Sequence, residues 1–316
     1  LAGSMVVILV VIVGVTTYLV NRMVNGWFLL LSGVRFRDVL SGLYAFRSDL
    51  VDGVTLRAGP GELVGLVGPN GAGKTSALKA ILGLATYDGD LSVLGKDPSR
   101  QRAALMEDVC FIADVAVLPR WIRVWQLLDV TEGIHPRFSR ERCLEYLAQT
   151  KITLDHKVKQ LSKGMVAQLH LALVMAIDAR LLVLDEPTLG LDILYRKQFY
   201  TSLLNDYFDE ERTILITTHQ VEEIEHILTD LIFIREGRIA LQATMEDVER
   251  RYSELLVKPN LADQARTLGP LYERELFGRH IFLYDNVSRD RLEGLGELHT
   301  PSVADLFVAT MKGGDS

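Results

Sequence analysis

Cysteine is scarce in this sequence. Only two cysteines, Cys110 and Cys143, occur among 316 residues, and they stand 33 positions apart. They form neither a C-x-x-C pair nor a cluster with histidine, so the sequence suggests no metal site built on cysteine. Two isolated thiols are typical of a protein in a reducing compartment, where we expect both to be buried or half-buried.

An excess of positive charge is also missing. The chain has 34 Lys and Arg against 41 Asp and Glu, and its formal net charge is −7. No long run of like charge, internal repeat or low-complexity tract occurs. Proteins that bind nucleic acid usually carry a basic face, so nucleic acid is not expected as a partner. The length allows one full-sized core and roughly a hundred residues of smaller additions.

The first thirty residues contain a long stretch without charge. Residues 5–20 have no charged side chain, although roughly eighteen apolar residues are typical of a clear membrane-spanning helix. A signal peptide would have a basic segment before the apolar run and an A-x-A site after it, and both are missing. Arginines follow the run, which would leave the rest of the chain in the cytoplasm if the run spans a membrane. Residues 1–30 are interpreted as either a membrane anchor or a truncated or extended leader.

The hydrophobic pattern alternates between strands and helices over residues 31–247. A helix is predicted from Lys74 to a glycine stop at Gly83, and residues 96–179 are mostly helical, as an inserted lobe would be. This alternation predicts an α/β fold with a mainly parallel sheet. After residue 247 the pattern loosens, so 248–316 are interpreted as a small α+β accessory domain. Strands are predicted at 31–36, 53–58, 62–68, 89–95, 180–186, 212–219 and 230–241.

The segment GPNGAGKT, residues 68–75, fits the pattern G-x-x-x-x-G-K-[ST] between a predicted strand and a predicted helix. Its glycines let successive backbone N–H groups surround an anion, while Lys74 reaches the outer phosphates of a nucleotide and Thr75 offers a hydroxyl to Mg²⁺. A glycine-rich turn that only caps a helix is the alternative. The predicted phosphate-binding residues are Gly68, Pro69, Asn70, Gly71, Ala72, Gly73, Lys74, Thr75 and Ser76.

Two adjacent acids follow a second apolar strand in LLVLDE. Asp185 is predicted to emerge at the strand end and to hold Mg²⁺ through its water shell. Glu186 points elsewhere and is placed to activate or orient a water for attack on the terminal phosphate. His219 closes another apolar strand beside the same crevice and is predicted to be catalytic. The alternative for the acids is a cap on the next helix.

These segments, together with LSKGM at 161–165 and LGLD at 189–192, resemble in their order the motifs of the nucleotide-binding subunit of ATP-binding cassette (ABC) transporters. The resemblance covers roughly residues 33–245 and implies a P-loop NTPase core that binds ATP and Mg²⁺. It implies that Ser162 and Gly164 contact the γ-phosphate held by a second subunit. Ser162 is also a good helix cap, and a capped helix N-terminus is itself an anion site.

The resemblance is incomplete at two places. The family's usual L-S-G-G-Q is here L-S-K-G-M, in which Lys163 either adds positive charge near a phosphate or faces solvent. Asp114 stands where the family generally has a glutamine that contacts Mg²⁺ and couples to the membrane subunit. The adenine-stacking aromatic is assigned to Tyr44, with Phe46 as the alternative. Asp192 is expected at the interface between two copies of the chain.

The resemblance implies an ATPase. The chain has one nucleotide loop, at 68–75, and one signature segment, LSKGM at 161–165. If the two serve different nucleotide sites, two copies must pair head to tail. The expected partner is a multi-span membrane permease subunit, and the expected place is the cytoplasmic face of the inner membrane, either peripheral or with one N-terminal anchor. Export is the preferred direction, as for bacterial exporter-type subunits. The alternative function is a non-transport regulatory or immunity module that uses ATP-driven dimerisation, and Asp114 is the feature that favours it.

Overall fold

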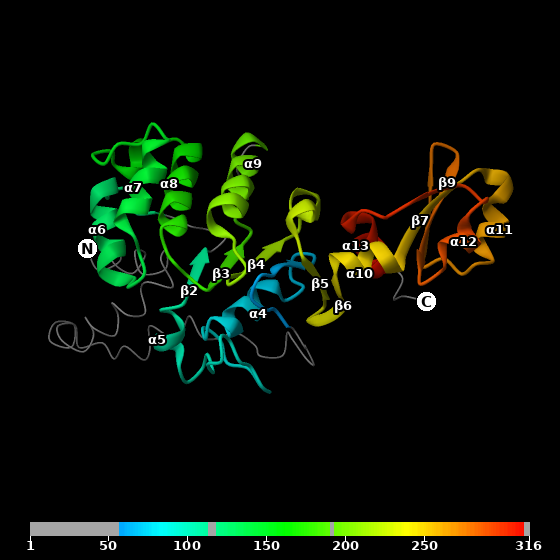
Figure 1. The fold of residues 1–316 in the computed structure, drawn as a ribbon, viewed down its shortest axis with the longest axis horizontal. Coiled ribbons are helices and arrows are strands. Elements are labelled where there is room, and N and C mark those ends of the chain that lie inside the picture. Colours follow the sequence, from blue (N-terminus) through cyan, green and yellow to red (C-terminus); the bar gives the residue numbers. More distant parts are fainter. Residues whose placement is uncertain (1–56, 113–117, 190–192, 313–316) are drawn as a thin grey trace. The chain divides into compact units, whose positions relative to one another are not determined.

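The computed structural model describes residues 57–112, 118–189 and 193–312 (Figure 1). The chain divides into two compact units, one with Ala58–Glu62 and Thr75–Thr217 and the other with Leu63–Lys74 and Thr218–Ser316. Within the described ranges, no helix combines the length and apolarity needed to cross a membrane. The predictions for the leader at 1–30, the strand at 31–36, Tyr44, Phe46, Asp114 and Asp192 fall outside these ranges.

The first unit contains a parallel sheet with the strand order β2-β3-β4. Strands β3 and β4 are buried along their whole length, as parallel strands covered on both faces are, and they confirm the predicted strands at 180–186 and 212–219. Strand β2 lies inside the segment predicted to be mostly helical, because a four-residue apolar run is too short to show a period. The bounds are β2 Val109–Ile112, β3 Leu181–Asp185 and β4 Thr213–Thr218.

The predicted strand at 89–95 is wrong. Val93 and Lys96 exchange two backbone hydrogen bonds of 2.8 and 2.9 Å around Leu94 and Gly95, whose φ angles are 50° and 75°. Two positive φ angles define the tightest hairpin turn, so the segment forms one turn between two bridged residues. The alternation of apolar residues therefore reflected a turn rather than a strand.

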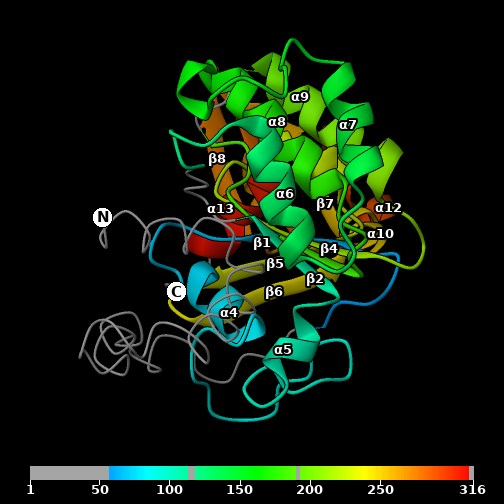
Figure 2. The ribbon, with the colours of Figure 1, turned by 90° about the vertical axis from the view of Figure 1, so that its left-hand side faces the viewer.

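Helices outnumber strands in the described part of the first unit. Helices α6, α7 and α8 pack side by side in the helical lobe (Figures 1 and 2). Ser139 caps α7 and Ser162 caps α8, each through its hydroxyl group. The bounds are α4 Lys74–Ile81, α5 Arg102–Leu105, α6 Val124–Ile134, α7 Arg140–Ala148, η3 Val158–Gln160, α8 Lys163–Met175, α9 Ile193–Ser202 and the π-helical turn η4 Leu203–Tyr207.

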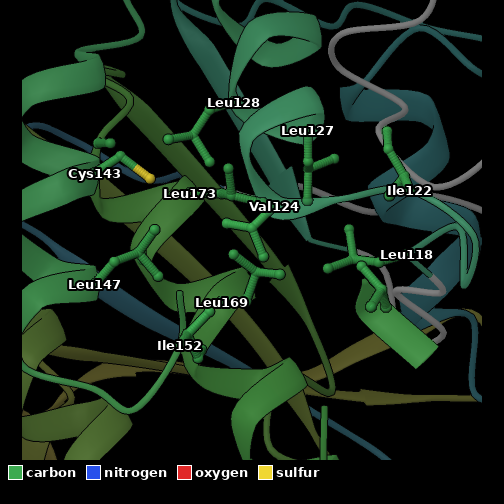
Figure 3. Close-up of a cluster of buried hydrophobic side chains, with 13 residues drawn as sticks. Leu118, Ile122, Val124, Leu127, Leu128, Cys143, Leu147, Ile152, Leu169 and Leu173 are labelled. Carbon is green, nitrogen blue, oxygen red and sulfur yellow. The ribbon is translucent and has the colours of Figure 1, made fainter. Parts of the chain in front are cut away.

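The lobe has an apolar core of its own (Figure 3). Leu128 from α6, Cys143 from α7 and Leu169 from α8 are fully buried in it. Burying a large aliphatic side chain stabilises a fold by about 1.5–3 kcal/mol, so this cluster holds the three helices together. The buried members are Leu118, Ile122, Val124, Leu127, Leu128, Cys143, Leu147, Ile152, Val158, Leu169, Ala172, Leu173 and Ala176.

In the second unit, strand β1 Leu63–Val67 pairs in parallel with β5 Asp230–Arg235, and β5 pairs antiparallel with β6 Arg238–Thr244. The predicted strand at 230–241 is therefore a hairpin, turned by Glu236 and Gly237 at φ 50° and 75°. The segment after His219 forms two 3₁₀ turns, η5 Val221–Glu223 and η6 Glu225–Ile227. Strands pair in parallel throughout β2-β3-β4 of the first unit and between β1 and β5 of the second, which confirms the mainly parallel α/β fold.

The remainder of the second unit is a four-stranded antiparallel sheet, which we call the accessory sheet, with the order β10-β7-β9-β8. Phe282 and Tyr284 of β9 are fully buried against α11 and α12. The predicted domain border at residue 248 falls within α10. The bounds are α10 Met245–Arg251, β7 Tyr252–Val257, η7 Pro259–Leu261, α11 Ala262–Arg266, β8 Tyr272–Leu276, β9 Arg279–Asp285, α12 Arg289–Leu292, β10 Glu297–His299 and α13 Val303–Lys312.

Candidate nucleotide site

The loop that follows β1 has the backbone needed to surround an anion. Gly71 and Gly73 have φ angles of 83° and 108°, which side chains larger than glycine rarely adopt. Between them Ala72 donates its N–H to the carbonyl of Pro69 at 3.1 Å and closes a turn. Pro69, Asn70 and Gly71 are exposed, so the predicted phosphate loop is accessible to a ligand.

Two tertiary contacts hold this loop in place. A Cβ atom on Gly68 would lie 2.5 Å from the carbonyl oxygen of Ile234, so only glycine allows β5 to approach so closely. Gly237, in the turn between β5 and β6, donates its N–H to the carbonyl of Ala72 at 2.9 Å. The β5–β6 hairpin therefore supports the loop from outside the motif, and no sequence pattern pointed to Gly237.

Lys74 begins helix α4 and is only 7% exposed. Its Nζ donates to the carbonyl of Gly68 at 2.6 Å and to that of Pro69 at 3.3 Å. A buried ammonium group that is encircled by its own loop supplies positive charge beside the N-terminus of a helix. The loop, the lysine and the helix start together fit the phosphates of a nucleotide.

Thr75, the next residue, lies beside Asp185. The Thr75 hydroxyl donates to Oδ2 of Asp185 at 3.3 Å, and the hydroxyl of Thr217 donates to Oδ1 at 2.5 Å. Asp185 is 5% exposed and Thr217 is fully buried, so the carboxylate orientation is fixed. Two oxygen atoms about 3 Å apart match neighbouring positions around an octahedral Mg²⁺ ion, so this pair fits the metal, with water and phosphate oxygens as the remaining ligands. Thr217 was not anticipated, although the polar pair TT at the end of an apolar strand was visible in the sequence.

The described residues contain no group of three or more His, Cys, Asp and Glu side chains suited to a metal ion. One carboxylate with a hydroxyl is nevertheless what Mg²⁺ uses when a substrate phosphate completes its coordination. The donor set therefore fits Mg²⁺ held together with a nucleotide rather than a permanent structural metal.

Glu186 turns away from the strand that carries Asp185. Its φ angle is 49°, in the left-handed region that glutamate rarely adopts. Its N–H donates to the carbonyl of Thr217 at 3.1 Å, and its own carbonyl accepts from Leu189 at 3.1 Å. Such strain persists only where surrounding bonds impose it, and it concentrates at functional sites. The two adjacent acids thus have different backbone conformations.

His219 directly follows β4 and is exposed. Gln220 donates its N–H to the hydroxyl of Thr218 at 2.9 Å, so the backbone on both sides of His219 is bound in a tight turn. The prediction that His219 ends a strand is confirmed. His219 belongs to the second unit and Glu186 to the first.

The signature segment forms the start of α8. The Ser162 hydroxyl accepts from the N–H of Met165 at 3.2 Å, and Lys163 is exposed at the first helical position. A Cβ atom on Gly164 would lie 2.5 Å from Cε2 of Tyr195 on α9. The ring of Tyr195 therefore packs closely against Gly164 in the first turn of α8, a contact that sequence patterns did not indicate.

Both cysteines are buried and reduced, as expected. Burial raises the pKa of the Cys110 thiol to about 12 and that of Cys143 to about 12. Both thiols therefore stay protonated at neutral pH and behave as small apolar groups.

A strand, a glycine-rich loop, a lysine at the start of a helix and an aspartate at the end of a second strand together define a P-loop NTPase. The family model described as "ABC transporter" matches residues 51–189, which include the phosphate loop, the signature segment and both acids. The chain belongs to the ABC transporter family, as an ATP-binding subunit.

Similar proteins agree with this assignment. The "Nod factor export ATP-binding protein I" of Burkholderia thailandensis is 34% identical over 284 residues, covering 82% of this chain and 91% of that protein. A solved structure of the ATP-binding subunit of an ABC transporter aligns with a TM-score of 0.58 at 24% identity, covering 64% of this chain and 86% of that chain. The structure of an Atm1-family bacterial ABC exporter with ATP bound aligns with a TM-score of 0.56 at 19% identity. The alignment covers 66% of this chain and 38% of that chain.

Proposed function

We propose that the protein is the ATP-hydrolysing motor subunit of an exporter. The observation that carries this proposal is the pair Asp185 and Glu186: one carboxylate is bound to Thr75 and Thr217, and the next residue is forced to φ 49°. Neighbouring acids with separate orientations suit separate tasks, one holding Mg²⁺ and the other orienting the attacking water.

In this proposal Lys74 and backbone N–H groups among residues 70–76 bind the phosphates, and Thr75 and Asp185 hold Mg²⁺. The metal would neutralise charge that develops on the phosphate oxygens. Glu186 accepts a proton from the attacking water or orients that water, and His219 contributes to catalysis at the end of its strand. Tyr44 stacking on the adenine and Asp114 assisting the metal remain proposals for residues outside the described ranges.

Two copies would act together. Ser162 and Gly164 would contact the γ-phosphate bound by the opposite copy, since a capped helix N-terminus offers backbone N–H groups to an anion. Asp192 would lie at the seam between the copies. Binding of ATP would close this dimer and hydrolysis would open it, which is the cycle that drives the partner subunit.

The partner would be a multi-span membrane permease, and the protein would lie at the cytoplasmic face of the inner membrane, peripherally or through one anchor in residues 1–30. Residues 31–247 would form the ATPase domain, with the helical lobe at about 96–179, and residues 248–316 the accessory domain. The export direction is supported by the name of the Burkholderia thailandensis relative, an export ATP-binding protein.

Glu186→Gln tests the proposed chemistry. ATP turnover by the purified full-length chain should fall by about 100-fold or more, because removing a general base costs that much, while ATP affinity stays near the wild-type value. Light scattering with Mg²⁺ and ATP should then show an accumulated dimer. Glu211→Gln, at an exposed position before β4, is the charge-matched control. Wild-type turnover in E186Q would show that Glu186 does not activate or orient the attacking water. A chain that stays monomeric with ATP would contradict the proposed dimer.

The partner is tested by affinity purification of the tagged full-length chain from gently solubilised membranes. A polytopic membrane protein recovered in equal amount is the expected result. A dimer of this chain recovered without any membrane protein would contradict the motor role in transport.

A further inference from the structure

Helix α13, at the end of the described chain, bonds to two segments that adjoin the nucleotide site. At its start, the N–H of Val303 donates to Oε1 of Glu225 at 3.0 Å. Near its end, the carbonyl of Met311 accepts from Nη1 of Arg235 at 2.6 Å. These bonds connect residues 78 and 76 positions apart in the sequence. One helix therefore fastens two distant parts of the ATPase chain.

The Glu225 end of the helix lies close in sequence to His219. Glu225 opens η6, and only η5 and one intervening residue separate it from the turn that holds His219. Val221 is 3% exposed and Ile224 is fully buried, so this short segment is anchored by its apolar side chains. The N–H groups of Glu223, Ile224 and Ile227 donate to the carbonyls of Gln220, Val221 and Ile224 at 3.3, 3.0 and 2.9 Å. These backbone bonds join the turn of Glu225 to the turn that holds His219.

The Arg235 end of the helix adjoins the phosphate loop. Arg235 is the last residue of β5, and the turn after it carries Gly237, which bonds to the carbonyl of Ala72. The rings of Phe307 on α13 and Phe233 on β5 meet edge to face, with centroids 5.1 Å apart. Helix α13 therefore contacts the strand β5, and the turn that follows this strand supports the phosphate loop.

The same helix is bound to the accessory sheet. Asp305 of α13 forms an ion pair of 2.7 Å with Arg274 of β8, which also approaches Glu254 of β7 at 3.6 Å. The ammonium of Lys312 lies 5.6 Å from the ring centroid of Tyr272, also on β8. A movement of the accessory sheet is thus transmitted to α13 through both ends of the helix.

We propose that α13 is a positioning element for ATP hydrolysis, with Glu225 as its positioning residue. Through it the accessory sheet controls the placement of His219 and of the phosphate loop. The inference rests on the proposed function, since it assigns control of that same site. Glu225 is suited to this part because its carboxylate accepts from the first N–H of a helix, where the helix dipole favours negative charge.

The test compares three variants of the full-length chain. Glu225→Ala should lower kcat for ATP about tenfold with little change in KM, since small displacements of catalytic groups cost that much or more. Glu225→Gln keeps an oxygen acceptor for the N–H of Val303 and should restore most of the activity. Glu222→Ala removes the same charge from an exposed position of the same segment and should leave kcat unchanged. Wild-type kcat in E225A, or equal losses in E225Q and E225A, would overturn the proposal.

Amide hydrogen exchange without nucleotide provides a readout that does not depend on activity. In E225A, exchange at residues 219–224 and 70–75 should quicken about tenfold, as expected when one charge-assisted hydrogen bond is lost, and E222A should match the wild type. If the wild-type chain hydrolyses no ATP, the proposed function fails while the exchange result still decides whether α13 holds these segments.

Arg274→Ala approaches the same helix from the accessory sheet and covers the case in which E225A does not fold. Its side chain is 38% exposed, so the fold should tolerate the change. Exchange in the same two segments should quicken and kcat should fall, in both cases less than in E225A. Unchanged exchange and unchanged kcat in R274A would show that the accessory sheet exerts no control through α13.

Discussion

The β5–β6 and β8–β9 hairpins turn in the same way and have different consequences. Glu236 and Gly237 have φ angles of 50° and 75°, and Phe277 and Gly278 have 50° and 71°. In the first turn the glycine N–H binds the phosphate loop through Ala72. In the second turn Phe277 is 98% exposed. The local backbone is the same, so the tertiary contact alone makes one of these turns part of the site.

The regions around these hairpins are also stabilised differently. Near the phosphate loop the decisive contacts are buried and short, such as Gly68 against Ile234. At the accessory sheet, Arg266 of α11 and Glu273 of β8 pair through two exposed bonds of 2.6 and 2.9 Å, over a small apolar core. Exposed ion pairs contribute little stability, whereas a close-packed contact tolerates no added atom. Substitutions should therefore disturb the first region far more than the second.

The largest effect is expected from Gly68→Ala. The new Cβ would lie 2.5 Å from the carbonyl oxygen of Ile234, so β5 and the loop must separate. Stability should fall by about 1–3 kcal/mol, as is usual for overpacking, and ATP affinity should fall with it. Thermal unfolding and equilibrium binding of ATP measure the two effects.

Gly133→Ala in α6 is the matched control for this change. Its Cβ would meet no atom within 4 Å, so stability should rise by about 0.5–1 kcal/mol, the usual gain from alanine within a helix. A G68A protein that binds ATP as the wild type does would contradict the close-packing argument.

An intermediate effect is expected from acid. Burial lowers the pKa of His170 in α8 from 6.5 to about 4, and burial also lowers the pKa of His135 at the end of α6. A depressed pKa in the folded state means that the unfolded chain binds more protons, so stability is full above pH 6.5 and falls as pH drops toward 4. For His170 the loss should reach about 1–2 kcal/mol at pH 5.

The accessory sheet should respond to acid later. The hydrogen bonds from Arg266 hold the pKa of Glu273 below its ordinary value of 4.5, so the stability from this pair is present above pH 4.5 and is lost below it. Unfolding midpoints at pH 7.5 and pH 5, followed by hydrogen exchange in α8 and in β9, separate the two regions. His170→Gln should reduce the loss at pH 5, and His226→Gln, at an exposed position, should not. A protein equally stable at both pH values would contradict the assignment.

The smallest effect is expected from Phe277→Asn. Asparagine tolerates a positive φ angle, and the pair N-G is favoured in two-residue hairpins, so stability should rise by about 0.5–1 kcal/mol. Thermal unfolding measures the gain, and ATP affinity should not change. A loss of stability would show that Phe277 makes a contact that its 98% exposure does not reveal.

Much of the site was predictable because its motifs depend on local chemistry. A phosphate loop needs glycines at positive φ and a lysine at a helix start, and both occur at consecutive positions from Gly68 to Lys74. The position of Asp185 was predictable because a charged residue that follows four apolar residues marks the end of a buried strand. Ser162 was predictable as a cap for the same local reason.

Other features could not be predicted from local patterns. The segment at 89–95 alternates like a strand but has no partner strand, and pairing rather than periodicity makes a strand. Strand β2 is four residues long, and only its pairing with β3 identifies it. Thr217, Gly237 and Tyr195 join the site through contacts with residues far away in the chain.

By itself the sequence determined the family, the phosphate loop and the acid pair, because each of these is written in consecutive residues whose chemistry acts locally. Only the tertiary structure decided which turn supports the loop, which hydroxyl orients Asp185 and where α13 is fastened. Such contacts depend on close approach between distant segments. Packing and strand pairing, rather than any local preference, set that approach.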